Sequence, residues 1–158
     1  MTDTSKLWQQ AVDTEEHNKV TMKVKCEGER PSYANRYAAG LDIRSNNQVY
    51  MAPGAIVDID TLLAVEIPKG CFGMVVARSG LSYKNQVKLI NDVGIIDEDY
   101  RGDIGIRLKN EGTEPYLIEV GDRIAQMIIV PYIQPTLLFV DKLEETERGS
   151  KGFGSTGK

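Results

Sequence analysis

The sequence predicts an all-β fold, a barrel or a sandwich, and two observations favour this class. Apolar and polar residues alternate in several short segments, as in Val20–Cys26, and a period of two is typical of half-buried strands. Turn signals such as Asn46-Asn47 and Pro53-Gly54 separate these segments at short intervals, which is typical of barrels and sandwiches. A chain of 158 residues is also long enough to bury the core of one domain.

The expected strands follow one another through the middle of the chain. Val20–Cys26 and the later alternating segments are predicted strands because their apolar residues recur with a period of two. Cys71–Ala77 is apolar enough to be a buried strand. Glycine, proline, asparagine or aspartate lies in each interval, as expected of turns. The sequence allows one short helix, at Arg78–Lys84. Strands are expected at 20–26, 37–45, 48–51, 56–59, 62–67, 71–77, 87–89, 104–108, 116–120, 124–130 and 137–140.

Both ends of the chain differ from this pattern. Residues 1–18 form a polar, acidic extension of unknown role, in which Leu7 and Ala11 have the i,i+4 spacing of a short amphipathic helix. Residues 19–143 form the predicted β-domain. Residues 144–158 are charged and then glycine-rich, with Phe153 almost the only apolar side chain, and are expected to be a mobile tail.

Composition argues against several classes of function. The net charge of −4 makes a nucleic-acid polymer an unfavourable partner, and no run is long enough to span a membrane. His17 is the only histidine, and Cys26 and Cys71 lie far apart, so neither a histidine triad nor a zinc site is expected. The polar N-terminus lacks a signal-peptide core, so we expect a cytoplasmic protein, in the host cytoplasm if it is viral.

The segment 91–102 carries the strongest chemical pattern. It joins two alternating segments, in outline a hairpin, and Gly94 allows close approach of the backbone to a flat ligand. Asp97 is a candidate base, and Tyr100 offers a flat face for a sugar. An ordinary acidic turn is the alternative for this segment alone.

Three other short segments have weaker signals. Asp42 follows a glycine turn and could hold magnesium through water, or cap the turn. Arg78-Ser79-Gly80 follows a buried strand and offers charge, hydroxyl and backbone amides to a phosphate. Gln126 could bind a phosphate or a water, while Asp122 and Arg123 beside it could pair with each other or across a subunit contact.

The tail contains a glycine-rich stretch, Arg148–Gly157. Arg148 and the backbone amides around Gly154, Ser155 and Thr156 could bind a terminal phosphate, and Phe153 could stack on a base for about 1–3 kcal/mol. The stretch lacks Walker spacing and a following helix, so a low-complexity disordered end is the alternative.

Taken together and in this order, the five segments resemble the five motifs of the trimeric dUTP pyrophosphatases (dUTPases). The segments are 39–43, 78–81, 91–102, 121–126 and 148–157, and the resemblance covers roughly residues 20–158. Lys151 stands where the family more often has glycine. The resemblance implies a jelly-roll-type β-barrel, assembled as a homotrimer whose C-terminal tails are exchanged between subunits.

The resemblance also implies hydrolysis of dUTP to dUMP and pyrophosphate by magnesium-assisted water attack on the α-phosphorus. This reaction would keep uracil out of DNA and supply dUMP for thymidylate synthesis. Asp97 would activate the water, Tyr100 would pack under the deoxyribose, and Asp42 would hold Mg²⁺ through water. Uracil would be read by Asn91 and the backbone near Gly94 and Ile96. The phosphates would be bound by Arg78, Ser79, Gly80, Gln126 and Arg148, with Gly154, Ser155 and Thr156 closing the lid and Phe153 covering the base.

Two alternatives differ from this hydrolase in testable ways. dCTP deaminases have a similar fold, but their essential Glu in a Leu-Glu-x-x-Asn pattern is replaced here by Arg107. A nucleotide-binding regulatory module, which signals through a partner protein, would bind dUTP without releasing pyrophosphate.

Overall fold

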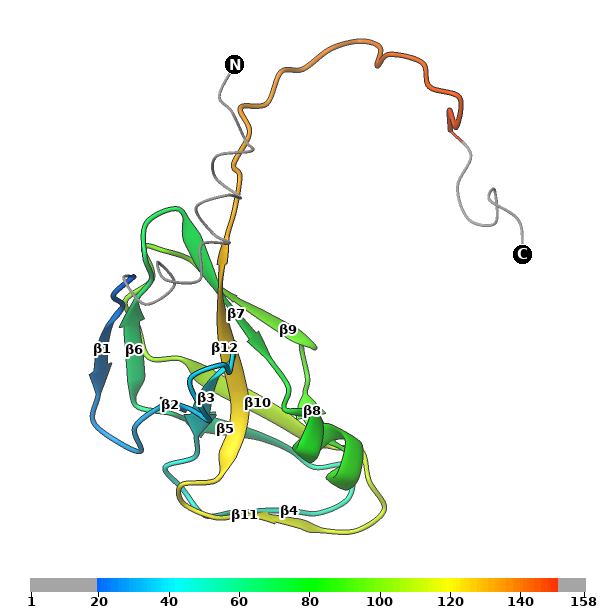
Figure 1. Cartoon of the computed structure of the whole chain (residues 1–158). Helices are drawn as coiled ribbons and strands as arrows, with labels where there is room; N and C mark the ends of the chain where they lie inside the picture. The colour runs from blue at the N-terminus through cyan, green and yellow to red at the C-terminus, as the bar shows by residue number, and fades with distance from the viewer. Residues whose placement is uncertain (1–19, 151–158) are drawn as a thin grey trace.

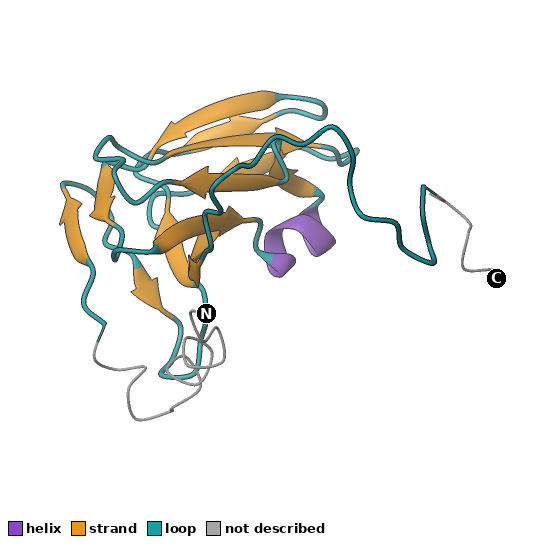
Figure 2. Cartoon of the chain, turned by 90° about the horizontal axis from the view of Figure 1, so that it is seen from above, coloured by secondary structure: helices purple, strands orange, loops and turns teal. Residues whose placement is uncertain are grey.

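Short antiparallel strands make up nearly all of the regular structure (Figures 1 and 2). The structure is a computed structural model, and it describes residues 20–150. The expected N-terminal extension and the tail residues Phe153, Gly154, Ser155 and Thr156 lie outside this range. Within it, the only helical segment is the single turn η1 (Gly80–Lys84), as the sequence predicted. No described helix has the length and apolar character needed to cross a membrane.

The largest sheet has five strands in the order β2-β3-β12-β7-β9. A second sheet has the order β5-β10-β8, and two ribbons pair β1 with β6 and β11 with β4. The bounds are β1 (Lys23–Cys26), β2 (Ser32–Tyr33), β3 (Leu41–Arg44), β4 (Val49–Met51), β5 (Ile56–Asp60), β6 (Leu63–Glu66), β7 (Cys71–Val76), β8 (Val87–Leu89), β9 (Val93–Ile96), β10 (Gly105–Asn110), β11 (Tyr116–Ile118) and β12 (Arg123–Pro131).

Strand β12 is the centre of the five-stranded sheet. It pairs with β3 on one side and β7 on the other, and Gln126 lies opposite both Asp42 and Val76. Its neighbours Ala125 and Met127 are buried, which anchors the strand in the core. The register therefore brings one residue of each of three distant segments into a single row across the sheet.

A continuous apolar core fills the space between the sheets. Its members come from alternate positions of the strands, as the period of two predicted. The largest fully buried side chains include Ile43, Met51, Ile59, Leu63, Ile104, Ile106, Leu108, Ile118, Ile124 and Met127. Together with the antiparallel pairing throughout, this arrangement is the predicted all-β jelly-roll-type fold.

The structure corrects the sequence prediction in two places. Segment 91–102 is not a simple hairpin loop: β8 and β10 pair as expected, but β9 lies between them in the chain and pairs with β7 in the other sheet. The strand expected at 137–140 is absent, and residues 132–150 run outward from the barrel (Figure 1). A strand needs a hydrogen-bonding partner, and residues 137–140 make no backbone hydrogen bond to any described residue.

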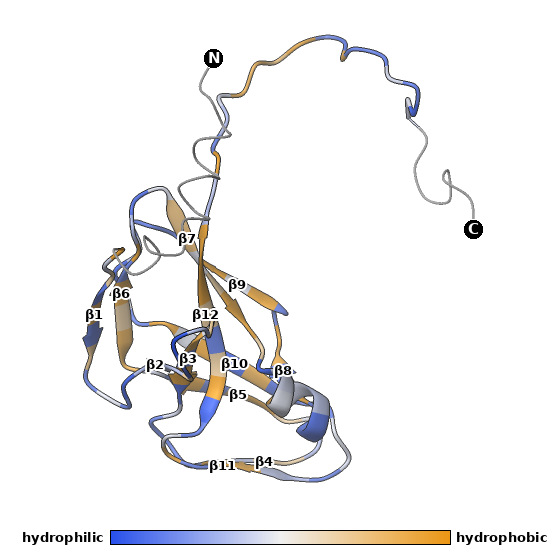
Figure 3. Cartoon of the chain, viewed as in Figure 1, coloured by the Kyte–Doolittle hydropathy of each residue, from blue (hydrophilic) through white to orange (hydrophobic). Residues whose placement is uncertain are grey.

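Part of the outgoing segment consists of hydrophobic residues (Figure 3). Phe139 is 90% exposed, Leu138 85% and Leu137 74%. Large exposed apolar surfaces are typical of interaction sites. The barrel itself ends near Pro131, where β12 ends.

Candidate functional site

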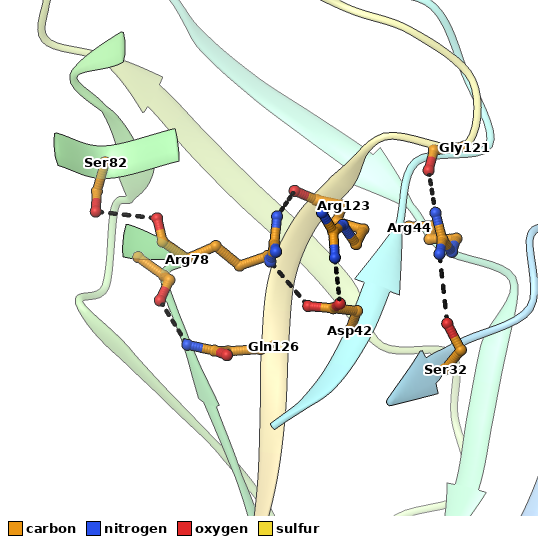
Figure 4. A network of polar contacts seen from close by, with 9 residues as sticks. Ser32, Asp42, Arg44, Arg78, Ser82, Gly121, Arg123 and Gln126 are labelled. Atoms are coloured by element: carbon orange, nitrogen blue, oxygen red, sulfur yellow. Dashed lines mark hydrogen bonds and ion pairs between the residues drawn. The ribbon is translucent and has the colours of Figure 1, made fainter. Parts of the chain in front are cut away.

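A buried carboxylate on the central sheet links two arginines (Figure 4). Asp42 on β3 is 3% exposed. Its Oδ1 forms an ion pair with Arg78 Nε at 2.8 Å, and its Oδ2 accepts a hydrogen bond from Arg123 Nη1 at 3.1 Å. Arg78 Nη1 also donates to the Arg123 carbonyl at 3.5 Å. The cluster holds two positive charges and one negative charge, so it is suited to an anionic ligand.

Gln126 lies beside this cluster. Its Nε2 donates to the Ala77 carbonyl at 3.2 Å, so the amide is held against the residue that precedes Arg78. Gly40 makes room for it, because a Cβ at Gly40 would lie 2.5 Å from Gln126 Oε1. Glycine at position 40, two residues before Asp42, therefore allows the close approach of the Gln126 side chain.

The segment Arg78-Ser79-Gly80 forms the turn into η1. The Arg78 carbonyl accepts hydrogen bonds from the backbone of Leu81 and Ser82, which closes the turn. Ser79 and Gly80 are exposed, and Ser79 makes no side-chain capping bond to the described turn. A Cβ at Gly80 would meet no atom within 4 Å, so its backbone faces open space. These groups remain accessible to a ligand.

The second group of predicted residues lies on and after β9. Asn91 and Asp97 are exposed, Gly94 pairs with Val75, and Ile96 pairs with Gly73. Asp92, after Asn91, has a left-handed backbone with φ of 54°, a conformation that Asp tolerates better than most residues. The group therefore occupies the edge strand of the sheet, open to solvent on its outer side.

A tight turn presents Asp97 and Tyr100. Tyr100 N donates to the Asp97 carbonyl at 3.2 Å, and the Tyr100 hydroxyl donates to the Asp103 carbonyl at 3.0 Å. A side chain at Gly102 would collide with that hydroxyl, so glycine is needed beneath the ring. Tyr100 is 44% exposed, which leaves one face of the ring available.

Glu98 ties this turn to the root of the outgoing segment. Its Oε2 accepts from Gly70 N at 2.6 Å and from the Tyr132 hydroxyl at 3.5 Å. Burial, with a further contribution from the Glu98 carboxylate, raises the pKa of Tyr132. The turn that holds Asp97 is thus fixed to the barrel at the point where the chain leaves it.

Asp97 and Arg78 lie far apart within one chain. Along β7, Val76 lies opposite Val93 and Gly73 lies opposite Ile96, so Asp97 follows the end of β9 that is farther from Arg78. Continuing this register places Asp97 opposite Phe72, which is six positions before Arg78. At roughly 3.3 Å per strand residue, Asp97 and Arg78 are therefore about 20 Å apart along β7. A general base must lie within hydrogen-bond reach of the proton that it takes, directly or through one water. Within one chain, Asp97 is therefore far from a phosphate held at the Arg78 turn.

The sequence did not reveal the contact that Arg123 makes. The pairing of Asp122 with Arg123 is wrong within the chain: Asp122 Oδ2 accepts from Glu119 N, and Arg123 reaches Asp42. Asp42 and Arg123 lie 81 positions apart in sequence, so only the β3–β12 register reveals the contact. Arg44, the neighbour of Arg123 across the strands, instead donates to the Gly121 carbonyl at 2.7 Å.

The residues around Asp42 suit magnesium only through water. Among residues 20–150, no group of three or more His, Cys, Asp or Glu side chains could hold a metal ion. Both Asp42 oxygens already pair with arginines, although each keeps a further lone pair. Mg²⁺ retains several waters and is commonly held by one or two carboxylates together with substrate phosphates. A single carboxylate facing a phosphate site fits this outer role.

Comparison with known proteins identifies the family. The dUTPase family model matches residues 27–157. The chain belongs to the dUTPase family. A deoxyuridine 5'-triphosphate nucleotidohydrolase of Anaeromyxobacter sp. (strain Fw109-5) is 45% identical over 145 residues, which cover 88% of this chain and 99% of the relative. The corresponding protein of Desulfitobacterium hafniense (strain DSM 10664 / DCB-2) is 46% identical over 130 residues, 80% of this chain and 86% of the relative.

Solved dUTPase structures share the fold. The dUTPase of Staphylococcus bacteriophage 80alpha with dUPNHPP matches with a TM-score of 0.79 at 33% identity, covering 87% of this chain and 99% of that one. A point mutant of the same phage dUTPase matches with a TM-score of 0.78 at 34% identity, covering 85% of this chain and 98% of that one. The family resemblance and the fold class predicted from the motifs are thereby confirmed.

Proposed function

We propose that this dUTPase family member hydrolyses dUTP to dUMP and pyrophosphate by water attack on the α-phosphorus. The observation that carries the proposal is the convergence of Asp42, Arg78 and Gln126, from three separate motifs, around one point of the central sheet: Gln126 lies opposite Asp42, Asp42 pairs with Arg78, and Gln126 donates to the carbonyl of Ala77, next to Arg78. A buried carboxylate thus lies beside an exposed turn of the kind that binds phosphate. Relatives of this chain are named deoxyuridine 5'-triphosphate nucleotidohydrolases, so we do not attribute this placement to chance.

On the phosphate side, the chain supplies positive charge and hydrogen-bond donors. Arg78 offers its guanidinium, while Ser79 and Gly80 offer the hydroxyl and backbone amides of an exposed turn. Gln126 lies next to them and can donate to a phosphate oxygen or orient a water. Local positive charge is needed because the net charge of −4 repels a triphosphate on average.

On the base and sugar side, Asn91 with the backbone at Gly94 and Ile96 would read uracil. The flat face of Tyr100 would pack under the deoxyribose and exclude a 2′-hydroxyl. Asp97 would accept the proton of the attacking water, a contribution typically worth about 10²–10⁴ in rate. Both acidic and aromatic side chains are exposed on the same turn, as this division of roles requires.

Asp42 would hold Mg²⁺ through water, and the bound ion would neutralise charge on the phosphates. The chain's own contribution to this chemistry is to fix the Asp42 carboxylate in one orientation through two arginines. The proposal predicts loss of turnover in EDTA and recovery on addition of magnesium.

We further propose a homotrimer in which neighbouring subunits share each site. Two observations support it: the separation of about 20 Å along β7 between Asp97 and Arg78, and the exposed apolar segment 137–140. A neighbouring copy would supply the missing half of each site and cover the outgoing segment. Residues 144–158, with Arg148 and Phe153, would then close over the bound nucleotide as a lid.

The dCTP deaminase alternative is disfavoured by the structure of β10. Arg107, at the position of the deaminase Glu, makes a two-point ion pair with Asp58 at 2.6 and 2.8 Å. The hydrogen bond from Arg107 also lowers the pKa of Asp58. This position is therefore occupied by a cross-strand surface contact.

The proposed cellular role is to keep uracil out of DNA and to supply dUMP, in the cytoplasm.

A nucleotide panel tests the proposal. Purified protein with magnesium should release pyrophosphate from dUTP far faster than from dCTP, dTTP or UTP. Hydrolysis in ¹⁸O-water should place the label in dUMP and leave the pyrophosphate unlabelled, because attack is at the α-phosphorus. Ammonia release from dCTP would support the deaminase, and dUTP binding without turnover would support a regulatory module.

A further inference from the structure

The Asp42 cluster contains one more arginine than the proposed phosphate site uses. Arg78 is assigned to the phosphates, whereas Arg123 is left without a role. The Arg123 side chain is 41% exposed, yet it reaches inward to a carboxylate that is almost fully buried. The Asp42 carboxylate is shared, with one oxygen for each guanidinium (Figure 4).

This sharing has an electrostatic consequence for Arg78. A carboxylate bound to one guanidinium alone neutralises it, and such charge-assisted bonds are strong. Because Arg123 occupies Oδ2, Asp42 contacts Arg78 only through Oδ1 and Nε. The cluster keeps a net positive charge, and the remaining donors of the Arg78 fork stay available to a phosphate.

Sharing also fixes the orientation of the carboxylate. Arg123 holds Asp42 from β12, while Arg78 holds it from the turn after β7. The Arg123 carbonyl accepts from Arg78 Nη1, so Arg123 contacts both partners. A carboxylate held at both oxygens cannot rotate freely, and a positioned group loses less entropy when a ligand arrives.

We propose that Arg123 is a positioning residue for phosphate binding, which acts through Asp42 by limiting how far Asp42 neutralises Arg78. The inference rests on the proposed function, in which Arg78 binds phosphates of dUTP. It assigns no direct contact between Arg123 and the substrate.

The first experiment compares nucleotide affinities by calorimetry with a non-hydrolysable dUTP analogue and with dUMP. Arg123→Gln should weaken the analogue about tenfold, a value between those of exposed and buried ion pairs. The affinity for dUMP should fall by a smaller factor, because dUMP carries fewer phosphates. Arg107→Gln is the matched control: it also removes one arginine and one Arg–Asp pair, on another sheet. It should bind both ligands as the wild type does.

The second experiment asks whether Arg123 acts through Asp42. In an Asp42→Asn background there is no carboxylate to share, so adding Arg123→Gln should change the analogue affinity by less than about twofold. An equal loss in both backgrounds would mean that Arg123 contacts the phosphates directly, and would overturn the positioning role. Wild-type affinity in the single Arg123→Gln variant would overturn it as well.

Two checks keep the outcome interpretable. Thermal unfolding should show the variants folded; if Arg123→Gln is not, Arg123→Met, which keeps the apolar stem, replaces it in the same comparisons. Arg123→Lys retains the charge and should recover part of the affinity. If the wild type itself neither binds nor hydrolyses dUTP, the proposed function fails. If the wild type does both, but Arg123→Gln lowers the analogue affinity equally with and without Asp42→Asn, only the role of Arg123 fails.

Discussion

Gly40→Ala is expected to damage catalysis while leaving the fold intact. The new Cβ would lie 2.5 Å from Gln126 Oε1, 3.1 Å from its Cδ and 3.3 Å from its Cβ. Ordinary contacts begin near 3.4 Å, so the amide must move by about 1 Å, and rotation about its last bond does not relieve the contact with Cδ. The displaced side chain would lose its bond to the Ala77 carbonyl.

A displacement of this size is costly in a positioned site. Misplacement by about 1 Å can lower the rate about 10²-fold, so kcat/KM for dUTP should fall by about that factor. The free energy of unfolding should change by about 1 kcal/mol or less, because the contacted group is the end of a flexible, half-buried side chain. Steady-state kinetics and thermal unfolding measure the two effects separately.

Two controls decide the cause. Gly105→Ala places a Cβ in open space on β10 and should leave kcat/KM unchanged. In a Gln126→Ala background, Gly40→Ala should add little, because the colliding group is gone. A folded Gly40→Ala protein with wild-type kcat/KM would refute the argument that Gln126 must lie where the structure places it.

The other predictions concern the second half of the site and the lid. Asp97→Asn should still bind dUTP but lose at least about 10²-fold in kcat, the usual worth of a general base; turnover close to wild type would remove Asp97 from the mechanism. Tyr100→Ala should raise kcat/KM for UTP relative to dUTP, and an unchanged ratio would argue against packing under the sugar. Truncation after Glu147 should preserve the melting temperature and trimer while removing most of kcat/KM; full activity would make the tail an ordinary disordered end.

The sequence predicted most strands because apolar and polar residues alternate in them, and the apolar positions are the ones that the fold buries. It missed β9, since Val93-Gly94-Ile95-Ile96 has no alternating pattern and its partner β7 is not its neighbour in the chain. It predicted a strand at 137–140 from apolar composition, but composition does not show whether a partner is available. Local pattern specifies which residues favour a strand, whereas pairing depends on the whole chain.

The candidate site shows the same division. The motifs named Asp42, Arg78 and Gln126 because each carries chemistry in a recognisable local setting. The sharing of Asp42 with Arg123 was not predictable, because it depends on a β3–β12 register and a contact 81 positions apart. Nor did the residue pattern show that Asp97 lies far along β7 from Arg78.

The shared site is the central claim, and mixed trimers test it most directly. Differently tagged Asp97→Asn and Arg78→Gln chains, each nearly inactive alone, are co-expressed and purified through both tags. If each site takes its Asp97 and its Arg78 from different subunits, every mixed trimer contains one intact site, so about one third of the wild-type kcat should return. Activity no greater than that of the two parent variants would show that both groups act within one chain, and would contradict the shared site.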